Sequence, residues 1–344
     1  MCLNIMFLKS KKLSRYYRRI IAMNILITQD KNIKFLFKIY YFIFLLIVLS
    51  VLTSLIYTNT FYQKSYTMKD MPLNHAEKDM QASYIIDLKT AKSLQQNELI
   101  YDTRIDQIRE TKSIPNIKVS QLPKDLKSIK SIKNRKELFI KITLPLIVQE
   151  NRKISSLNQN IKLIKNSFDQ ISRKEAIWVQ NLMEEYKADT LDSLLIKVDE
   201  IPVSLALAQA VIESGWGTSR FAYEGNALFG QYIWGKTNDG IIPNERETDA
   251  KYKIKSFNNL SESVASYMKN LNTNFHYNEF RINRFVLRSN KIPLKGTYLA
   301  EFLSSYSIED DYIDKIKNII EINDFQDFEN LSIDQQTPLI TDII

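Results

Sequence analysis

The sequence predicts a mainly α protein of the α+β class, with a small β lobe, preceded by one transmembrane helix and a spacer. From about Lys136 onward, apolar residues recur at spacings of three and four, which is typical of helices. Strand-like alternation is confined to the region from Phe229 to Phe257. An uncharged apolar run from Ile39 to Tyr57 supplies the membrane helix.

The first 38 residues form a basic leader, with nine Lys or Arg against one acid, Asp30. The next 19 residues, 39–57, carry no charge and are long enough to cross about 30 Å of hydrocarbon as a helix. Because positive charge favours the cytoplasmic side, we expect a single-pass inner-membrane protein with its N-terminus inside. A buried core helix and a cleaved signal peptide are the alternatives, and Met23 is an alternative start.

Residues 58–135 are polar, lack a sustained period and are interrupted by Pro72, Pro115 and Pro123. We interpret them as a partly disordered spacer that holds the next domain away from the membrane. Residues 136–325 form the helical domain, and residues 326–344 form a C-terminal tail. Short helices are expected at Thr190–Val198 and after Asn259, which is spaced with Glu262 like a capping box.

The composition excludes several kinds of site. With two histidines and one cysteine, His75, His276 and Cys2, the chain cannot build a zinc site of three or four His/Cys ligands inside a folded domain. A Cys–His pair is excluded as well. We therefore expect no metal and no cofactor, and proton transfer by carboxylate and tyrosine. The net charge of +8 belongs to the leader, so nucleic acid is not an expected partner.

The glycines are concentrated in one short segment. Six of the seven lie between Gly215 and Gly240, after 214 residues that contain none. Pro202 suits the start of an apolar helix that Gly215 ends, which places Glu213 in the last turn. Apolar surroundings and the negative end of the helix dipole both raise the pKa of a carboxyl group. Glu213 is therefore a candidate general acid, the alternative being a solvent-facing glutamate at a helix end.

Aromatic residues follow Glu213 closely and suit the binding of sugar rings. The substrate-binding candidates are Trp216, Tyr223, Asn226, Tyr232 and Trp234. Core packing is the alternative, and we expect it for about half of the aromatic residues, Phe229 first.

These residues carry a resemblance. The segment AQAVIESGWGTSRFAYEGNALFG resembles the signature of glycoside hydrolase family 73, the peptidoglycan N-acetylglucosaminidases, and in particular its Bax-like branch. Two later runs, from Ser256 to Arg281 and from Leu303 to Ile316, are similar to that branch too. The likeness extends over about Glu137 to Asn323 and implies a lysozyme-like helical fold with a small β lobe and a long groove.

The resemblance also implies roles for individual residues. The family's general acid corresponds to Glu213, and its active-site tyrosine corresponds to Tyr306 through the motif YSIEDDY. The second acid corresponds to Glu245 in PNERE, but this stretch departs from the family pattern, so Glu247 and Asp249 stay open.

The expected function is a membrane-anchored hydrolase of peptidoglycan glycan strands that cleaves the β-1,4 bond after N-acetylglucosamine, with the catalytic domain facing a periplasm. A lytic transglycosylase on the same fold and a catalytically silent wall-binding scaffold are the alternatives. Stereochemistry, oligomeric state and protein partners do not follow from the sequence.

Overall fold

The computed structural model describes residues 84–86, 90–97, 100, 102–167, 170–234, 240–243 and 252–334, all within the unit from Asp70 to Ile344. The basic leader, the predicted membrane segment and much of the predicted spacer lie outside these residues, as do Glu245, Glu247 and Asp249. Within the described part, no helix combines the length and the apolar character that crossing a membrane requires.

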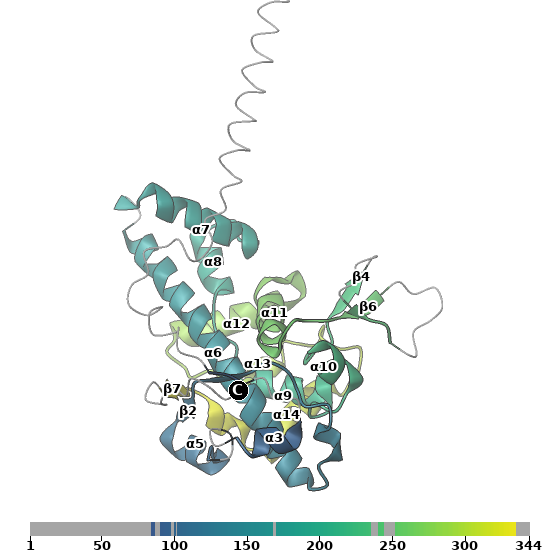
Figure 1. Ribbon diagram of the computed structural model, residues 1–344. Helices are drawn as coiled ribbons and strands as arrows, with labels where there is room; N and C mark the ends of the chain where they lie inside the picture. The colour runs from purple at the N-terminus through teal and green to yellow at the C-terminus, as the bar shows by residue number, and fades with distance from the viewer. Residues whose placement is uncertain are drawn as a thin grey trace, which may run out of the picture. The chain divides into compact units, whose positions relative to one another are not determined.

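The described residues are mostly helical, which confirms the mainly α prediction and is consistent with a lysozyme-like fold (Figure 1). The α-helices are α3 (Ala91–Gln95), α5 (Ile105–Thr111), α6 (Ile132–Asn166), α7 (Arg173–Glu185), α8 (Leu191–Lys197), α9 (Val203–Ser214), α10 (Arg220–Gly225), α11 (Leu260–Thr273), α12 (Asn278–Ser289), α13 (Gly296–Ala300) and α14 (Tyr312–Ile322). Short 3-10 helices are η3 (Leu126–Ser128), η5 (Phe275–Tyr277) and η6 (Phe325–Phe328). The strands are β1 (Tyr84–Ile86), β2 (Ser113–Pro115), β3 (Ile117–Val119), β4 (Tyr232–Trp234), β5 (Gly240–Ile241), β6 (Tyr252–Lys255) and β7 (Ser332–Asp334).

Helix α9 lies at the centre of this arrangement and packs against α6, α13, α14 and η6 (Figure 1). Its residues from Val203 to Val211 are all buried, as the apolar sequence predicts. Helix α13 approaches closely because Gly296 has no side chain. A Cβ there would lie 2.2 Å from Ser204 Oγ. The core is therefore built around the helix that ends at Glu213.

The β lobe is a three-stranded antiparallel sheet in the order β4-β6-β5, with Tyr232 opposite Ile254 and Ile241 also opposite Ile254. It falls within the predicted region from Phe229 to Phe257. The lobe follows the glycine-rich segment directly, so it stands beside the C-terminal end of α9.

Of two further strand pairs, β2–β7 joins the predicted spacer to the predicted tail, and β1–β3 lies within the predicted spacer. Parallel strands β2 and β7 pair Ile114 with Ile333, and β1 pairs with β3. Ile114, Leu122 and Leu126 are each 1% exposed and belong to the core around Phe139. Residues 113–135 thus contribute to the folded body, because their scattered apolar side chains pack although they follow no period.

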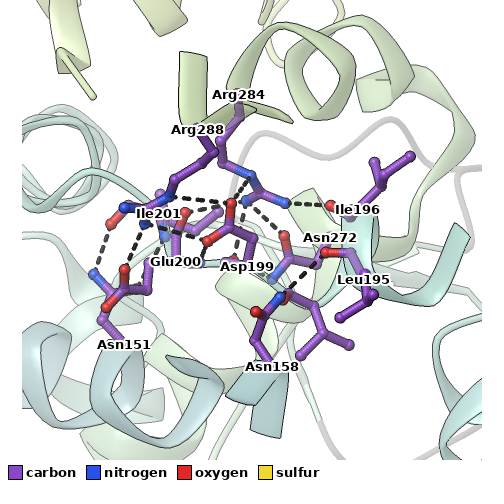
Figure 2. Close-up of polar contacts among 11 residues, drawn as sticks. Asn151, Asn158, Leu195, Ile196, Asp199, Glu200, Ile201, Asn272, Arg284 and Arg288 are labelled. Atoms are coloured by element: carbon purple, nitrogen blue, oxygen red, sulfur yellow. Dashed lines mark hydrogen bonds and ion pairs between the residues drawn. The ribbon is translucent and has the colours of Figure 1, made fainter. Parts of the chain in front are cut away.

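The loop that leads into α9 is held by a buried polar cluster (Figure 2). The Arg284 side chain, which is fully buried, donates to the carbonyl oxygens of Ile196, Asp199 and Glu200 at 3.0–3.2 Å. It also donates to Asn272 Oδ1 at 2.8 Å and forms an ion pair with the Asp199 carboxylate. The cluster joins α8, α11 and α12 to the loop before α9, since its members come from these segments.

Candidate active site

The two ends of α9 are capped in different ways. Pro202 at its N-terminus offers no side-chain cap, and the carboxylate of Glu329 instead accepts from the backbone N–H groups of Val203 and Ser204, both at 3.0 Å. At the C-terminus, Gly215 adopts the left-handed conformation, with φ of 56°. Glu213 therefore lies in the last turn, as predicted.

The backbone turns sharply after Glu213, because Gly215, Trp216 and Gly217 all have positive φ. A Cβ at Gly217 would come within 2.9 Å of the side chains of Leu126 and Phe139, so only glycine fits there. This accounts for the GWG sequence. The two glycines supply left-handed backbone and close packing, and the tryptophan between them is forced into the same conformation.

Glu213 faces a groove of about 670 Å³ between the helical body and the β lobe. One wall comes from α11 and β6 and is largely polar, with Lys255, Ser266 and Lys269. The other comes from the segment Tyr306–Ile308 before α14, and Phe229 to Ile233 connect the two walls. A groove lined by both polar and aromatic side chains is suited to a carbohydrate, whose hydroxyl groups form hydrogen bonds and whose ring faces pack on aromatic rings.

One oxygen of the Glu213 carboxyl group is hydrogen-bonded to the protein, and the other lies next to the groove. Oε1 lies 2.8 Å from the Tyr312 hydroxyl, and Oε2 lies 3.3 Å from where a Cβ would stand at Gly230, a groove residue with φ of 56°. Burial raises the pKa of Glu213, the hydrogen bond from Tyr312 lowers it, and nearby Glu309 raises it. The net effect is upward, which favours the protonated form that a general acid requires.

Tyr306 lines the same groove, so the structure brings it together with Glu213. Its ring stacks on that of Tyr312, with centroids 5.6 Å apart and an interplanar angle of 8°. Its hydroxyl lies 3.5 Å from the carbonyl oxygen of Phe229. Burial raises the pKa of the Tyr306 phenol well above its usual value, so the group is a neutral hydroxyl that can donate or accept a hydrogen bond.

The predicted substrate-binding residues divide into two groups. Tyr232, 62% exposed, lines the groove, and Trp234, 71% exposed, lies two residues further along β4. Both rings contact Tyr252 on β6, with centroids 5.1 and 5.8 Å away. Together they form an exposed aromatic surface that continues from the groove.

The other three candidates do not line this groove. Trp216 packs edge-on against Phe139 and Phe325. The ring of Tyr223 lies 5.8 Å from Lys127 Nζ, and Asn226 donates to the carbonyl oxygen of Phe257 at 3.0 Å. Phe229 is 3% exposed and stacks on Tyr267, which confirms the expectation that it packs in the core.

Sequence reasoning overlooked three residues that hold Glu213. Tyr312 contacts it directly, and Gln209 and Tyr267 continue the contact into the core. Two signals were present in the sequence. Gln209 is a polar residue four positions before Glu213 on an otherwise apolar helix, and Tyr312 is the second tyrosine of the YSIEDDY motif.

No set of three or more His, Cys, Asp and Glu side chains in the described part of the chain is arranged to bind a metal ion. Glu245, Glu247 and Asp249, the candidates for the second acid, belong to residues outside that part. The geometry therefore bears on Glu213 and Tyr306 and leaves the second acid as a prediction.

Comparison with known proteins identifies the family of the chain. Residues 190–325 match the glucosaminidase family, described as mannosyl-glycoprotein endo-β-N-acetylglucosaminidase. Protein bax from Escherichia coli (strain K12) is 33% identical over 201 residues, covering 55% of this chain and 69% of the relative. Exo-glucosaminidase LytG from Bacillus subtilis (strain 168) is 25% identical over 213 residues, covering 59% of this chain and 70% of the relative.

Among solved structures, the catalytic domain of the autolysin Auto from Listeria monocytogenes matches with a TM-score of 0.30 and 15% identity, covering 49% of this chain and 96% of that one. The residues matched to the glucosaminidase family include Glu213 and Tyr306. The chain therefore belongs to the glucosaminidase family, glycoside hydrolase family 73, and is a glycoside hydrolase.

Proposed function

We propose that this protein is a peptidoglycan hydrolase that cleaves the β-1,4 bond on the reducing side of N-acetylglucosamine. The observation that carries the proposal is Glu213, a partly buried carboxyl group with a raised pKa that faces a groove of about 670 Å³. The exposed rings of Tyr232 and Trp234 extend the groove with surfaces on which sugar rings can stack. The names of the relatives support an N-acetylglucosamine substrate.

In the proposed reaction, Glu213 gives its proton to the glycosidic oxygen as the bond from that oxygen to C1 breaks. Water adds to C1, where one of its hydrogens stays in the new hydroxyl group and the other passes to a base, and Glu213 regains a proton from solvent. The transition state resembles an oxocarbenium ion and develops positive charge at C1. A second carboxylate, Glu245 first and otherwise Glu247 or Asp249, activates the water or stabilises that charge. Tyr306 orients the sugar or the water from the groove wall formed by the segment before α14.

The proposed location is the outer face of the inner membrane, with residues 39–57 as the anchor. The nine basic residues before Ile39 favour a cytoplasmic N-terminus. A reporter fused after Ile344 should be active only outside the cytoplasm, and deletion of residues 1–57 should release the protein from membranes. A reporter that works in the cytoplasm would refute the orientation.

Digestion of purified peptidoglycan tests the reaction. Mass spectrometry should find reducing N-acetylglucosamine ends, whereas anhydro-muropeptides would indicate a lytic transglycosylase. Glu213→Gln keeps the size of the side chain but removes the transferable proton, and it should lower turnover by about a hundredfold or more. Near-normal turnover in this variant would refute the proposal, and binding without product in the wild type would indicate a scaffold.

The second acid is tested by three matched substitutions. Glu245→Gln should lower turnover far more than Glu247→Gln or Asp249→Asn. Equal and mild effects would instead indicate that Glu213 acts with Tyr306 or with the acetamido group of the substrate.

A further inference from the structure

A line of hydrogen bonds runs from the core to Glu213. The hydroxyl of Tyr267 donates to Gln209 Oε1 at 2.7 Å, and Gln209 Nε2 donates to the hydroxyl oxygen of Tyr312 at 3.0 Å. The Tyr312 hydroxyl lies 2.8 Å from Glu213 Oε1. Tyr267 and Gln209 are fully buried and Tyr312 is 3% exposed, so solvent competes little for these bonds.

The order of donors in this line follows from the orientation of the Gln209 amide. An amide NH₂ group can only donate, so Gln209 occupies the Tyr312 oxygen as an acceptor. The single hydroxyl hydrogen of Tyr312 then has one acceptor among its hydrogen-bond partners, Glu213 Oε1. Of the two oxygens of a protonated carboxyl group, the carbonyl oxygen is the stronger acceptor, so the oxygen that accepts this hydrogen is disfavoured as the site of the carboxyl proton. The remaining site is Oε2.

The surroundings of Oε2 agree with this assignment. Gly230 adjoins it, and a Cβ at that position would lie 3.3 Å from Oε2. Gly230 lines the groove, whereas Tyr312 does not. The oxygen held by tyrosine thus faces the protein, and the free oxygen adjoins the space where substrate binds.

We propose that Tyr312 is the positioning residue of the general acid. It holds Glu213 Oε1 as an acceptor and leaves the transferable proton on Oε2, beside Gly230. Gln209 and Tyr267 orient the Tyr312 hydroxyl for this task. The inference rests on the proposed function. It adds to the proposed site three residues that act through Glu213 and do not touch substrate.

Other charged and titratable groups lie around the groove that Glu213 faces. Glu309, from the segment before α14, raises the Glu213 pKa. Lys255 on β6 and Lys269 on α11 line the same groove, as do the hydroxyls of Tyr277 and Tyr306. None of these groups is removed by a substitution at Tyr312, so the effect of Tyr312 can be measured against a constant background.

The test is the pH dependence of turnover in Tyr312→Phe, with Tyr186→Phe as the matched control. Tyr186 is also buried, at 5% exposed, and does not line the groove. Its ring lies 3.1 Å from Lys269 Nζ, a contact that phenylalanine keeps. Turnover by a general acid falls as pH rises through its pKa. Because the Tyr312 hydrogen bond lowers the Glu213 pKa, its loss should raise the pH at which turnover falls by about one unit. Gln209→Met should raise this pH as well, and Tyr186→Phe should leave it unchanged.

A second measurement does not depend on turnover. Titration of the Glu213 carboxyl by ¹³C NMR, identified by its absence in Glu213→Gln, should show the same upward shift in Tyr312→Phe. Gly230→Ala should lower turnover by about tenfold or more, because it crowds Oε2, with the Tyr312 bond intact.

The outcomes separate the inference from the proposed function. If Glu213→Gln is inactive while Tyr312→Phe has the wild-type pH profile and the wild-type titration, the positioning role is wrong and the hydrolase stands. If Glu213→Gln keeps full turnover, the proposed function fails first. Should Tyr312→Phe fail to fold, the NMR titration of Gln209→Met decides. A Glu213 pKa in Gln209→Met equal to that of the wild type overturns the inference.

Discussion

Replacing the buried Arg284 should destabilise the protein more than any other single change to its charged residues that we consider. Burial lowers the pKa of Arg284 to about 10, which still leaves the guanidinium charged at neutral pH. Arg284→Met keeps much of the apolar volume but removes the donors to Ile196, Asp199 and Glu200 and one partner of the Asp199 carboxylate. Breaking a buried ion pair from one side costs about 3–5 kcal/mol.

The lower part of this range applies, because Arg288 still pairs with Asp199 at 3.2 Å. We therefore expect a loss of about 3 kcal/mol in the free energy of unfolding. Arg288→Met is the matched control, since the Arg288 side chain is 42% exposed and its pairs should contribute about 1 kcal/mol or less. Urea unfolding followed by tryptophan fluorescence measures both. Equal, small losses in the two variants would show that the cluster in Figure 2 does not hold the loop before α9.

Three further predictions concern α9. Burial raises the pKa of Glu213 in the folded protein, so as pH rises above about 4 this carboxyl group ionises in the unfolded chain before it does in the folded protein. The wild type should then lose stability relative to Glu213→Gln, and thermal melts at pH 4 and pH 7 should show the variant gaining only at the higher pH. Glu329→Gln leaves an amide NH₂ facing backbone donors and should cost about 1–3 kcal/mol in urea unfolding, whereas a cost near zero would refute the capping role. Gly296→Ala places a Cβ 2.2 Å from Ser204 Oγ and should cost about 1–3 kcal/mol by the same assay, whereas no loss would show that close packing of α13 on α9 is not needed.

The sequence predicted the local features of the site well, because those features depend on neighbouring residues. The apolar helix, its end at Gly215 and the place of Glu213 in the last turn follow from residues within a dozen positions of one another. The β lobe and the N-cap at Asn259, whose side chain accepts from Glu262 N at 3.0 Å, are local in the same sense. These predictions needed no knowledge of how distant segments pack.

What the sequence did not predict depends on contacts between distant segments. Glu329 caps α9 from 125 residues away, and Tyr312 reaches Glu213 from 99 residues away. Trp216 resembled a sugar-binding residue because tryptophan beside a catalytic glutamate suits that role. Its ring instead fills a space between Phe139 and Phe325, which only the tertiary packing reveals. Strand β2 likewise pairs with β7, far away in the chain.

The two carboxyl groups at the ends of α9 show how one helix acts on similar groups in opposite directions. Burial raises the pKa of both Glu213 and Glu329. At the N-terminus, Glu329 accepts from two backbone N–H groups and the Ser204 hydroxyl, and the helix dipole favours its negative charge. At the C-terminus, Glu213 accepts from one tyrosine hydroxyl, and the dipole opposes its charge. The same helix thus favours an ionised carboxylate at its N-terminal end, where it stabilises the fold, and a protonated carboxyl at its C-terminal end, where the proposed reaction needs an acid.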